Sequence, residues 1–264
     1  MHALAVAGFG KLGSAVVRGA VAAGVVRPEQ VVVWARSEAR RQEALSLGVR
    51  LAEWPEVMNA APRVLLALKP QVFAEMAAQR PVMQPGALVI SVMGGWRAAD
   101  LGARLGTDRV IRAMPTIAAA QRASTTALCM PSGMAAEDAA FAESLFRSVG
   151  SVVPMPEMQV DAATATCGSG VGFVALFMEA LERAAQEAGV PAPQARALAL
   201  GAVEGAAACV RAGAAPQELR AAVTSPAGTT FAGLEALRSG DFEPLVRRAV
   251  QAAQARAAEL GAPR

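Results

Sequence analysis

Four hydroxyl side chains lie close together in the stretch TSPAGTTFAGLEAL, residues 224–237. Thr224, Ser225, Thr229 and Thr230 surround a proline and a glycine, directly before a sequence with helical character. The first turn of a helix has backbone N–H groups without intrahelical partners, and the helix dipole attracts negative charge there. Hydroxyl groups gathered at such a position are suited to bind an anion such as a carboxylate. N-capping by Ser225 or by Thr229 is the simpler interpretation, but it explains only one hydroxyl.

A second group with chemical potential lies near the N-terminus, in the stretch VAGFGKLG, residues 6–13. Its three glycines match the G-x-G-x-x-G pattern, directly after an apolar run and at the start of a helical sequence, which is the context the pattern requires. Gly8 permits a tight turn, Gly10 lets the backbone approach a pyrophosphate, and Gly13 lets the helix pack closely on the strand. We therefore expect a dinucleotide to bind here. The expected contacts are Gly8, Phe9, Gly10, Lys11, Leu12 and Gly13.

The residues after the second apolar run, VVVWARSEAR, indicate which dinucleotide is bound. An acidic residue at this point would bind the ribose 2′-hydroxyl of NAD, but Trp34 and Ala35 occupy these positions. Arg36 and Ser37 follow, and a cation and a hydroxyl at a helix start suit a 2′-phosphate. We expect NADPH as the cofactor, with NADH as a weaker alternative. Further cofactor contacts are expected where later strands end, at Ala67, Lys69, Pro70, Met93 and Gly94, and at Ser225 in the second half.

Absent residue types narrow the chemistry. The chain has no tyrosine, His2 is its only histidine, and no lysine lies beyond Lys69. Catalysis by Ser-His-Asp or Cys-His groups and a histidine-based metal site are therefore excluded, and no metal is expected. Reduction of a carbonyl normally needs a protein proton donor, whereas an imine is basic enough to arrive protonated. An imine reductase can thus work by orientation and electrostatics.

Composition and charge exclude several other classes of protein. The net charge of +3 is small and the arginines are dispersed, so we expect no nucleic-acid partner. The three cysteines, Cys129, Cys167 and Cys209, show no disulfide or metal spacing, which favours a cytoplasmic location. The densest apolar runs are shorter than the roughly 20 residues of a membrane span, and no signal peptide is recognisable, so we expect no membrane partner.

The expected elements are those that would position these groups. In the first half, apolar runs alternate with helical segments, which predicts a doubly wound parallel sheet of Rossmann type. The expected strands are residues 3–8, 30–36, 63–70, 86–95, 108–115, 124–131 and 151–156. The second half contains long Ala- and Leu-rich helical stretches and no convincing strand. We expect an α/β cofactor domain over residues 1–155 and an all-helical substrate and dimerisation domain over residues 156–264.

The sequence as a whole resembles the Δ1-pyrroline-5-carboxylate reductase family. The similarity continues from the cofactor half through DAATATCGSGVGF, residues 161–173, and is strongest at residues 224–237, the signature region of the family. The resemblance implies NADPH-dependent reduction of the cyclic imine to L-proline, the last step of proline biosynthesis. It also implies a domain-swapped homodimer, often assembled further into a ring such as a decamer. The substrate contacts that it implies are Ser169, Gly170, Gly228, Thr229 and Thr230, with Thr230 as the catalytic residue beside the carboxylate or the imine nitrogen.

Three segments depart from the family pattern. M-P-N-T-P is replaced by Met-Pro-Thr-Ile-Ala at residues 114–118, and Pro-Ala-Tyr by Val-Gly-Phe at residues 171–173. In SPGG, the first glycine is replaced by Ala227, which fits only if the backbone does not need a positive φ there. These changes leave two alternatives open: a reductase of a related cyclic imine such as piperideine carboxylate, or a non-catalytic NADP-binding paralogue.

Overall fold

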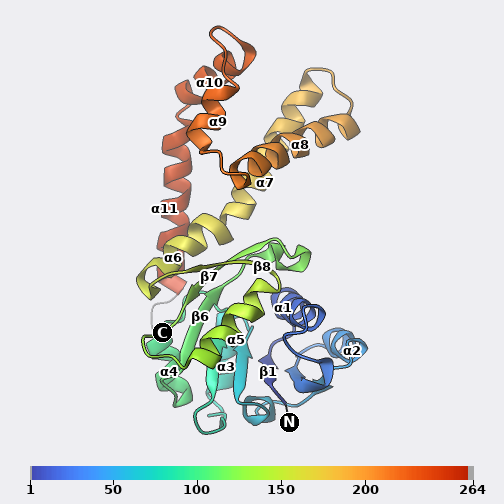
Figure 1. The fold of residues 1–264 in the computed structure, drawn as a ribbon, viewed down its shortest axis with the longest axis vertical. Coiled ribbons are helices and arrows are strands. Elements are labelled where there is room, and N and C mark those ends of the chain that lie inside the picture. Colours follow the sequence, from blue (N-terminus) through green and yellow to red (C-terminus); the bar gives the residue numbers. More distant parts are fainter. Residues whose placement is uncertain (1, 261–264) are drawn as a thin grey trace. The chain divides into compact units, whose positions relative to one another are not determined.

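The computed structural model describes residues 2–260, which divide into two compact units (Figure 1). The first unit contains the residues up to Gly168 together with those from Ala253 onward, and the second contains Ser169–Ala252. The domain boundary expected near residue 155 stays a prediction.

The first unit is built on an eight-stranded sheet with the order β3-β2-β1-β4-β5-β6-β7-β8. All strand pairs are parallel except β6 with β7, so the predicted parallel sheet contains one antiparallel pair. The physical reason is the connection, residues 115–123, which is shorter than the dozen or so residues that a parallel crossover needs. The strands are β1 (Leu4–Ala7), β2 (Val31–Trp34), β3 (Arg50–Leu51), β4 (Arg63–Leu66), β5 (Leu88–Ser91), β6 (Val110–Met114), β7 (Ser124–Cys129) and β8 (Gly150–Pro154).

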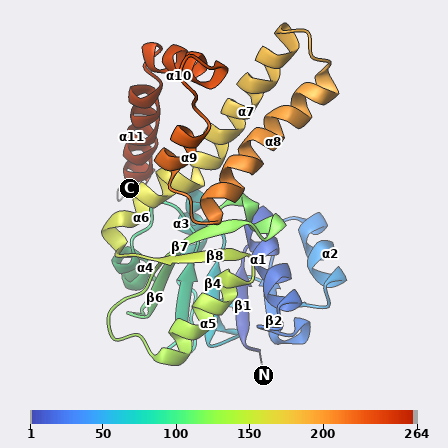
Figure 2. The same cartoon turned by 45° about the horizontal axis from the view of Figure 1, so that its top comes forward.

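Helices cover both faces of this sheet (Figure 2). The side chains of β1 alternate: Leu4 and Val6 belong to one buried cluster, while Ala5 and Ala7 belong to the other. Because successive side chains of a strand point to opposite faces, two clusters mean that neither face is open to solvent. The first cluster includes residues of α1 (Lys11–Ala22), α2 (Glu38–Ser46) and α5 (Ala136–Arg147), and the second includes residues of α3 (Pro70–Ala77) and α4 (Ala98–Leu105). The doubly wound fold is thereby confirmed.

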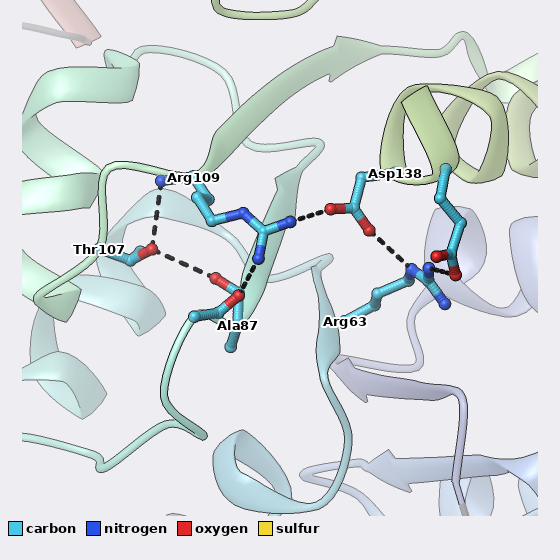
Figure 3. Close-up of polar contacts among 7 residues, drawn as sticks. Arg63, Ala87, Thr107, Arg109 and Asp138 are labelled. Carbon is cyan, nitrogen blue, oxygen red and sulfur yellow. Dashed lines mark hydrogen bonds and ion pairs between the residues drawn. The ribbon is translucent and has the colours of Figure 1, made fainter. Parts of the chain in front are cut away.

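A polar network joins the amino ends of the central strands to the start of α5 (Figure 3). Asp138 accepts hydrogen bonds from Arg63, at 3.1 Å, and from Arg109. Arg63 also pairs with Glu137 at 2.5 Å, and Arg109 donates to the carbonyl oxygen of Gly86. One largely buried carboxylate therefore ties α5 to β4 and to Arg109, the residue before β6, at the edge of the sheet opposite to the glycine loop.

A buried arginine holds the segment that follows β8. Arg112 of β6 is 3% exposed, and its guanidinium lies 3.1 Å from Glu157 in η4 (Glu157–Gln159) and 3.8 Å from Asp161 in α6 (Val160–Ala163). Glu157 also accepts a hydrogen bond from the backbone N–H of Ala98, the first residue of α4. These contacts fix the chain just before a short π-helix, η5 (Thr164–Gly168).

The second unit is entirely helical in its described residues. It contains α7 (Gly170–Glu187), α8 (Ala192–Arg211), α9 (Pro216–Ala222), α10 (Thr229–Ser239) and most of α11 (Phe242–Leu260). Helices α7 and α8 lie side by side (Figures 1 and 2). Only Ala195 and Ala199 are buried among its residues, while large apolar side chains such as Leu176 and Leu198 are exposed. A unit with so little core of its own needs further surface to pack against.

One helical stretch, Glu157–Glu187, is long and apolar enough by composition to cross a membrane, with a mean hydropathy of 1.4. The expectation that no apolar segment reaches this length therefore needs correction. One such helix is weak evidence for a membrane span, because helices of protein cores and interfaces have the same composition.

Candidate active site

The carboxyl ends of β1, β2, β4 and β5 meet at one edge of the sheet and bring together the cofactor residues predicted in the first unit. The N–H of Gly8 donates to the carbonyl of Trp34 at 3.0 Å, and the N–H of Ala67 donates to that of Ala7 at 2.8 Å. These hydrogen bonds join the ends of β1, β2 and β4 where ligands of open α/β sheets bind.

The glycines of the loop differ in how much space a side chain would have at each position. Gly8 has a φ of +105°, and a Cβ at this position would lie 2.5 Å from the carbonyl oxygen of Ala67. A Cβ on Gly13 would collide with the carbonyl oxygen of Gly8, and it would lie 3.1 Å from the Ala67 methyl group. Gly10 is different, because no atom lies within 4 Å of its Cβ position. The loop is therefore packed tightly at Gly8 and Gly13 and is open at Gly10, as approach of a pyrophosphate requires.

The first turn of α1 is open to an anion. Gly10 is the N-cap, no side chain caps the helix, and the first turn contains no acidic residue. Lys11 is exposed, and Leu12 is half-buried. Phe9 is only 1% exposed and belongs to the core, so only its backbone is free to contact a cofactor. Free N–H groups, the helix dipole and a nearby cation together suit phosphate.

The end of β2 presents a cation and a hydroxyl but no carboxylate. Trp34 is buried and packs edge-on against Trp54, with 6.0 Å between the ring centroids. Arg36 and Ser37 are both exposed. Ser37 is the N-cap of α2, but its hydroxyl does not cap the helix, and Arg36 takes part in no ion pair among residues 2–260. Both side chains are thus available to a 2′-phosphate.

The remaining cofactor predictions fall at strand ends with different degrees of access. Lys69 is exposed at the N-cap of α3, and Pro70 is the first residue of that helix. Gly94 is half-buried with open space at its Cβ position. Met93 is 1% exposed and its N–H donates to the hydroxyl of Ser91 at 3.2 Å, which leaves only its carbonyl for a ligand. Ser225 lies in the second unit, and its role as a cofactor contact stays a prediction.

The hydroxyl cluster lies at the N-terminus of α10, and side-chain capping does not explain it. Gly228 is the N-cap, and no side chain caps the helix. The N–H of Gly228 donates to the carbonyl of Ser225 at 3.0 Å, which closes a turn before the helix. Thr224 is committed elsewhere, because its hydroxyl donates to the carbonyl of Arg220 at 2.6 Å. The hydroxyls of Ser225, Thr229 and Thr230 make no hydrogen bond among the described residues.

The turn before α10 contains strained backbone. Ala227 has a φ of +56°, in the left-handed region where glycine is favoured. Alanine was expected to fit here only if the backbone did not need a positive φ, and the structure does have a positive φ at this residue. Gly228 has a different constraint, because a Cβ there would collide with the hydroxyl of Ser225. The backbone adopts this turn although alanine disfavours the left-handed conformation. The turn determines where the first N–H groups of α10 lie.

Ser169 and Gly170 are at the start of α7, directly after the π-helix. Ser169 is the N-cap, and its carbonyl accepts from the N–H groups of Gly172, at 2.8 Å, and Phe173. Its hydroxyl makes no hydrogen bond among the described residues. π-helices are rare in proteins, and those that occur are often found at functional sites. Sequence reasoning missed this one, since no residue pattern announces an i→i+5 turn.

Hydroxyl groups hold the segment after β6, which departs from the family pattern, against the start of β7. Thr116 is 4% exposed, its N–H donates to the hydroxyl of Ser124 at 2.9 Å, and its own hydroxyl accepts from the N–H of Ala118 at 3.3 Å. Ile117 is 55% exposed. Sequence reasoning noted both substitutions but missed Ser124, because only the antiparallel pairing of β6 with β7 brings it close.

Residues 157–260 match the family model for pyrroline-5-carboxylate reductase dimerisation, and residues 3–95 match that described as NADP oxidoreductase, coenzyme F420-dependent. The pyrroline-5-carboxylate reductase of Thermus thermophilus is 37% identical over 260 residues, which cover 98% of both chains. The chain belongs to the pyrroline-5-carboxylate reductase family.

Two solved structures of pyrroline-5-carboxylate reductases have a similar fold. The enzyme from Coxiella burnetii has a TM-score of 0.87 at 31% identity and covers 99% of both chains. The enzyme from Plasmodium falciparum, solved with NADP bound, also has a TM-score of 0.87, covering 99% of this chain and 98% of its own. Its identity is 24%, so this likeness shows the fold alone.

Proposed function

We propose that this member of the pyrroline-5-carboxylate reductase family reduces 1-pyrroline-5-carboxylate to L-proline with NADPH. The observation that carries the proposal is the N-terminus of α10, where Thr229, Thr230 and the uncapped first turn offer donors to a carboxylate. In this proposal residues 1–155 bind the cofactor, and residues 156–264 bind the substrate and form the dimer.

The chain's own residues bind and orient rather than transfer protons. The imine nitrogen is protonated before binding, which makes its carbon electrophilic. This removes the need for a proton-donating tyrosine, which the chain lacks, or histidine, of which it has only His2. The first N–H groups of α10 hold the substrate carboxylate, and the Thr230 hydroxyl donates to it or lies beside the imine nitrogen. Gly228, Ser169 and Gly170 shape the pocket.

The structure of the glycine loop fits NADPH. The N–H groups at the start of α1 bind the pyrophosphate, Gly10 leaves space for it, and Arg36 and Ser37 bind the 2′-phosphate. When bound, NADPH supplies the hydride that reduces the C=N bond.

The second unit carries the dimerisation domain of the family. We infer a homodimer, with a decamer as the higher assembly, located in the cytoplasm. The exposed apolar side chains of α7 and α8 support this, because pairing with a second copy would bury them. Sedimentation velocity at several protein concentrations tests the assembly, and a monomer at micromolar concentration would contradict it.

The decisive test compares two threonines at the same turn. Thr230→Val should lower kcat/KM for the imine by about 10- to 100-fold, as expected for loss of a hydrogen bond to a charged group. Thr224→Val is the matched control, because that hydroxyl is bonded to Arg220. NADPH oxidation is followed for both variants. Equal losses would contradict the assigned role of Thr230, and no turnover by the wild-type protein would contradict the function.

A second candidate function is reduction of a related cyclic imino acid. The exposed Ile117 favours it, since the family has a polar threonine at this position. A panel with five- and six-membered imines separates the two, because the true substrate should have the higher kcat/KM. Binding of NADPH without turnover of any imine would instead identify a non-catalytic paralogue.

Cofactor preference is tested at Arg36. Arg36→Ala should raise KM for NADPH by about tenfold or more and leave KM for NADH unchanged, because only the 2′-phosphate needs the cation. An equal change for both cofactors would show that Arg36 acts on some other part of the dinucleotide.

A further inference from the structure

A groove within the first unit lies away from most of the residues predicted to bind the cofactor. It runs along α1 between α2 and the short helix η3 (Ile117–Gln121), and its volume is about 690 Å³. We call it the α1 groove. Its size falls within the range of roughly 300–1,000 Å³ typical of small-molecule sites. Small residues such as Ala15, Ala22 and Ala120 form part of its lining.

The α1 groove concentrates positive charge. Four cations line it, Lys11, Arg18, Arg40 and Arg122, against the single carboxylate of Glu43. Its formal charge of +3 equals that of the whole chain, which means that the rest of the protein is neutral overall. The low-dielectric walls of a concave surface focus the electric field of the charges that line it. An anion is therefore attracted here more strongly than to a scattered set of arginines.

Glu43 orients two of these cations. Its carboxylate pairs with Arg18 at 3.1 Å and also with Arg40. Burial raises the pKa of Glu43, but the hydrogen bonds from Arg18 and Arg40 outweigh this effect and the net pKa is lowered. The carboxylate is therefore ionised at neutral pH. Each guanidinium has five N–H donors, so donors remain for a ligand on both arginines.

The other two cations are unpaired. Lys11 and Arg122 take part in no ion pair among residues 2–260. Arg122 ends η3 with a φ of +55°, a position where glycine or asparagine is usual.

The α1 groove shares only Lys11 with the predicted cofactor site, so its three arginines remain for a second anion when the dinucleotide is bound. Of the residues predicted to contact the dinucleotide, only Lys11 lines it, while Arg36 and Ser37 do not. We propose that the α1 groove is a second anion site of this protein, which binds a phosphorylated small molecule while the dinucleotide is bound. Several guanidinium groups around one space match the geometry of phosphate oxygens.

The test measures binding to the full-length protein saturated with NADP⁺, by isothermal titration calorimetry. ATP and inorganic tripolyphosphate are the two probes, since tighter binding of ATP would show that a nucleoside is recognised in addition to phosphate. Arg18→Gln and Arg122→Asn should each weaken binding by about tenfold. Asparagine tolerates positive φ, so Arg122→Asn should fold normally. Arg104→Ala is the control, because Arg104 is exposed in α4 outside the α1 groove.

The outcomes are clear-cut. Binding that is weakened by both groove variants and not by the control supports the proposal. No binding in the presence of NADP⁺, or equal losses in groove and control variants, would overturn it. Turnover of the imine at saturating NADPH should be unchanged in Arg122→Asn, so failure of this site is separate from failure of the proposed function.

Discussion

Neutralising Asp138 should destabilise the first unit much more than neutralising its neighbour Glu137. Asp138 has a side chain that is 11% exposed, and it accepts from Arg63, 15% exposed, and Arg109, 36% exposed (Figure 3). Removing one partner of a fully buried ion pair costs about 3–5 kcal/mol. Since Arg109 is partly solvated and Arg63 keeps Glu137, we expect Asp138→Asn to cost about 2–3 kcal/mol.

Glu137→Gln is a closely matched control. Both acids lie in the first turn of α5 and pair with Arg63, so each has the same favourable interaction with the helix dipole. Glu137 is 84% exposed, and its ion pair should contribute at most about 1 kcal/mol. The difference between the two variants therefore measures the combined effect of burial and of the second arginine partner, Arg109.

Tryptophan fluorescence during urea unfolding is the assay. Trp34, Trp54 and Trp96 are the only tryptophans, and all lie in the first unit, so the signal reports on that unit alone. We expect a clear fall in the urea midpoint for Asp138→Asn, with the slope unchanged. Equal midpoints for Asp138→Asn and Glu137→Gln would refute the view that this carboxylate holds α5 to the sheet.

Three further predictions concern the loop, the turn and the thiols. Gly10→Ala should lower the affinity for NADPH without changing the stability of the fold. Gly13→Ala should lower both, because its Cβ would collide with the loop. Fluorescence titration with NADPH measures the affinity, and urea unfolding measures the stability. Ala227→Gly should stabilise the turn before α10 by about 0.5–1 kcal/mol, and slower hydrogen exchange at the start of α10 measures it. Burial raises the pKa of the Cys129 and Cys167 thiols, so both should be alkylated at pH 8 much more slowly than in urea, as mass spectrometry of the peptides would show.

The sequence was sufficient for those parts of the fold that depend on local pattern. Uniformly apolar runs such as Val31–Trp34 predicted buried strands, and the strand-to-helix context of the glycine loop predicted the cofactor edge. Strand β3 was not predicted because it has only two residues, Arg50 and Leu51, and neither is buried. Short edge strands carry no hydrophobic period and depend on their neighbour for pairing.

Other features depend on contacts between residues far apart in sequence. Arg112 lies within an expected apolar strand, and its partners Glu157 and Asp161 follow more than forty residues later. A buried arginine does require acidic partners, so their existence could have been inferred, but not their identity. The φ of Ala227 could not be foreseen either, because alanine at a left-handed position runs against its own preference.

The proposed chemistry explains why this chain can depart from the family sequence at several positions. At both expected binding points, the N-termini of α1 and α10, no side chain caps the helix, and the donors are backbone N–H groups. Backbone donors persist through substitution as long as the turn before the helix keeps its conformation. Ala227 is consistent with this, because the alanine adopts the positive φ although it is strained. Substitutions such as Ile117 remove none of the groups proposed to hold the anions, so we expect them to affect the choice of imine before they affect hydride transfer itself.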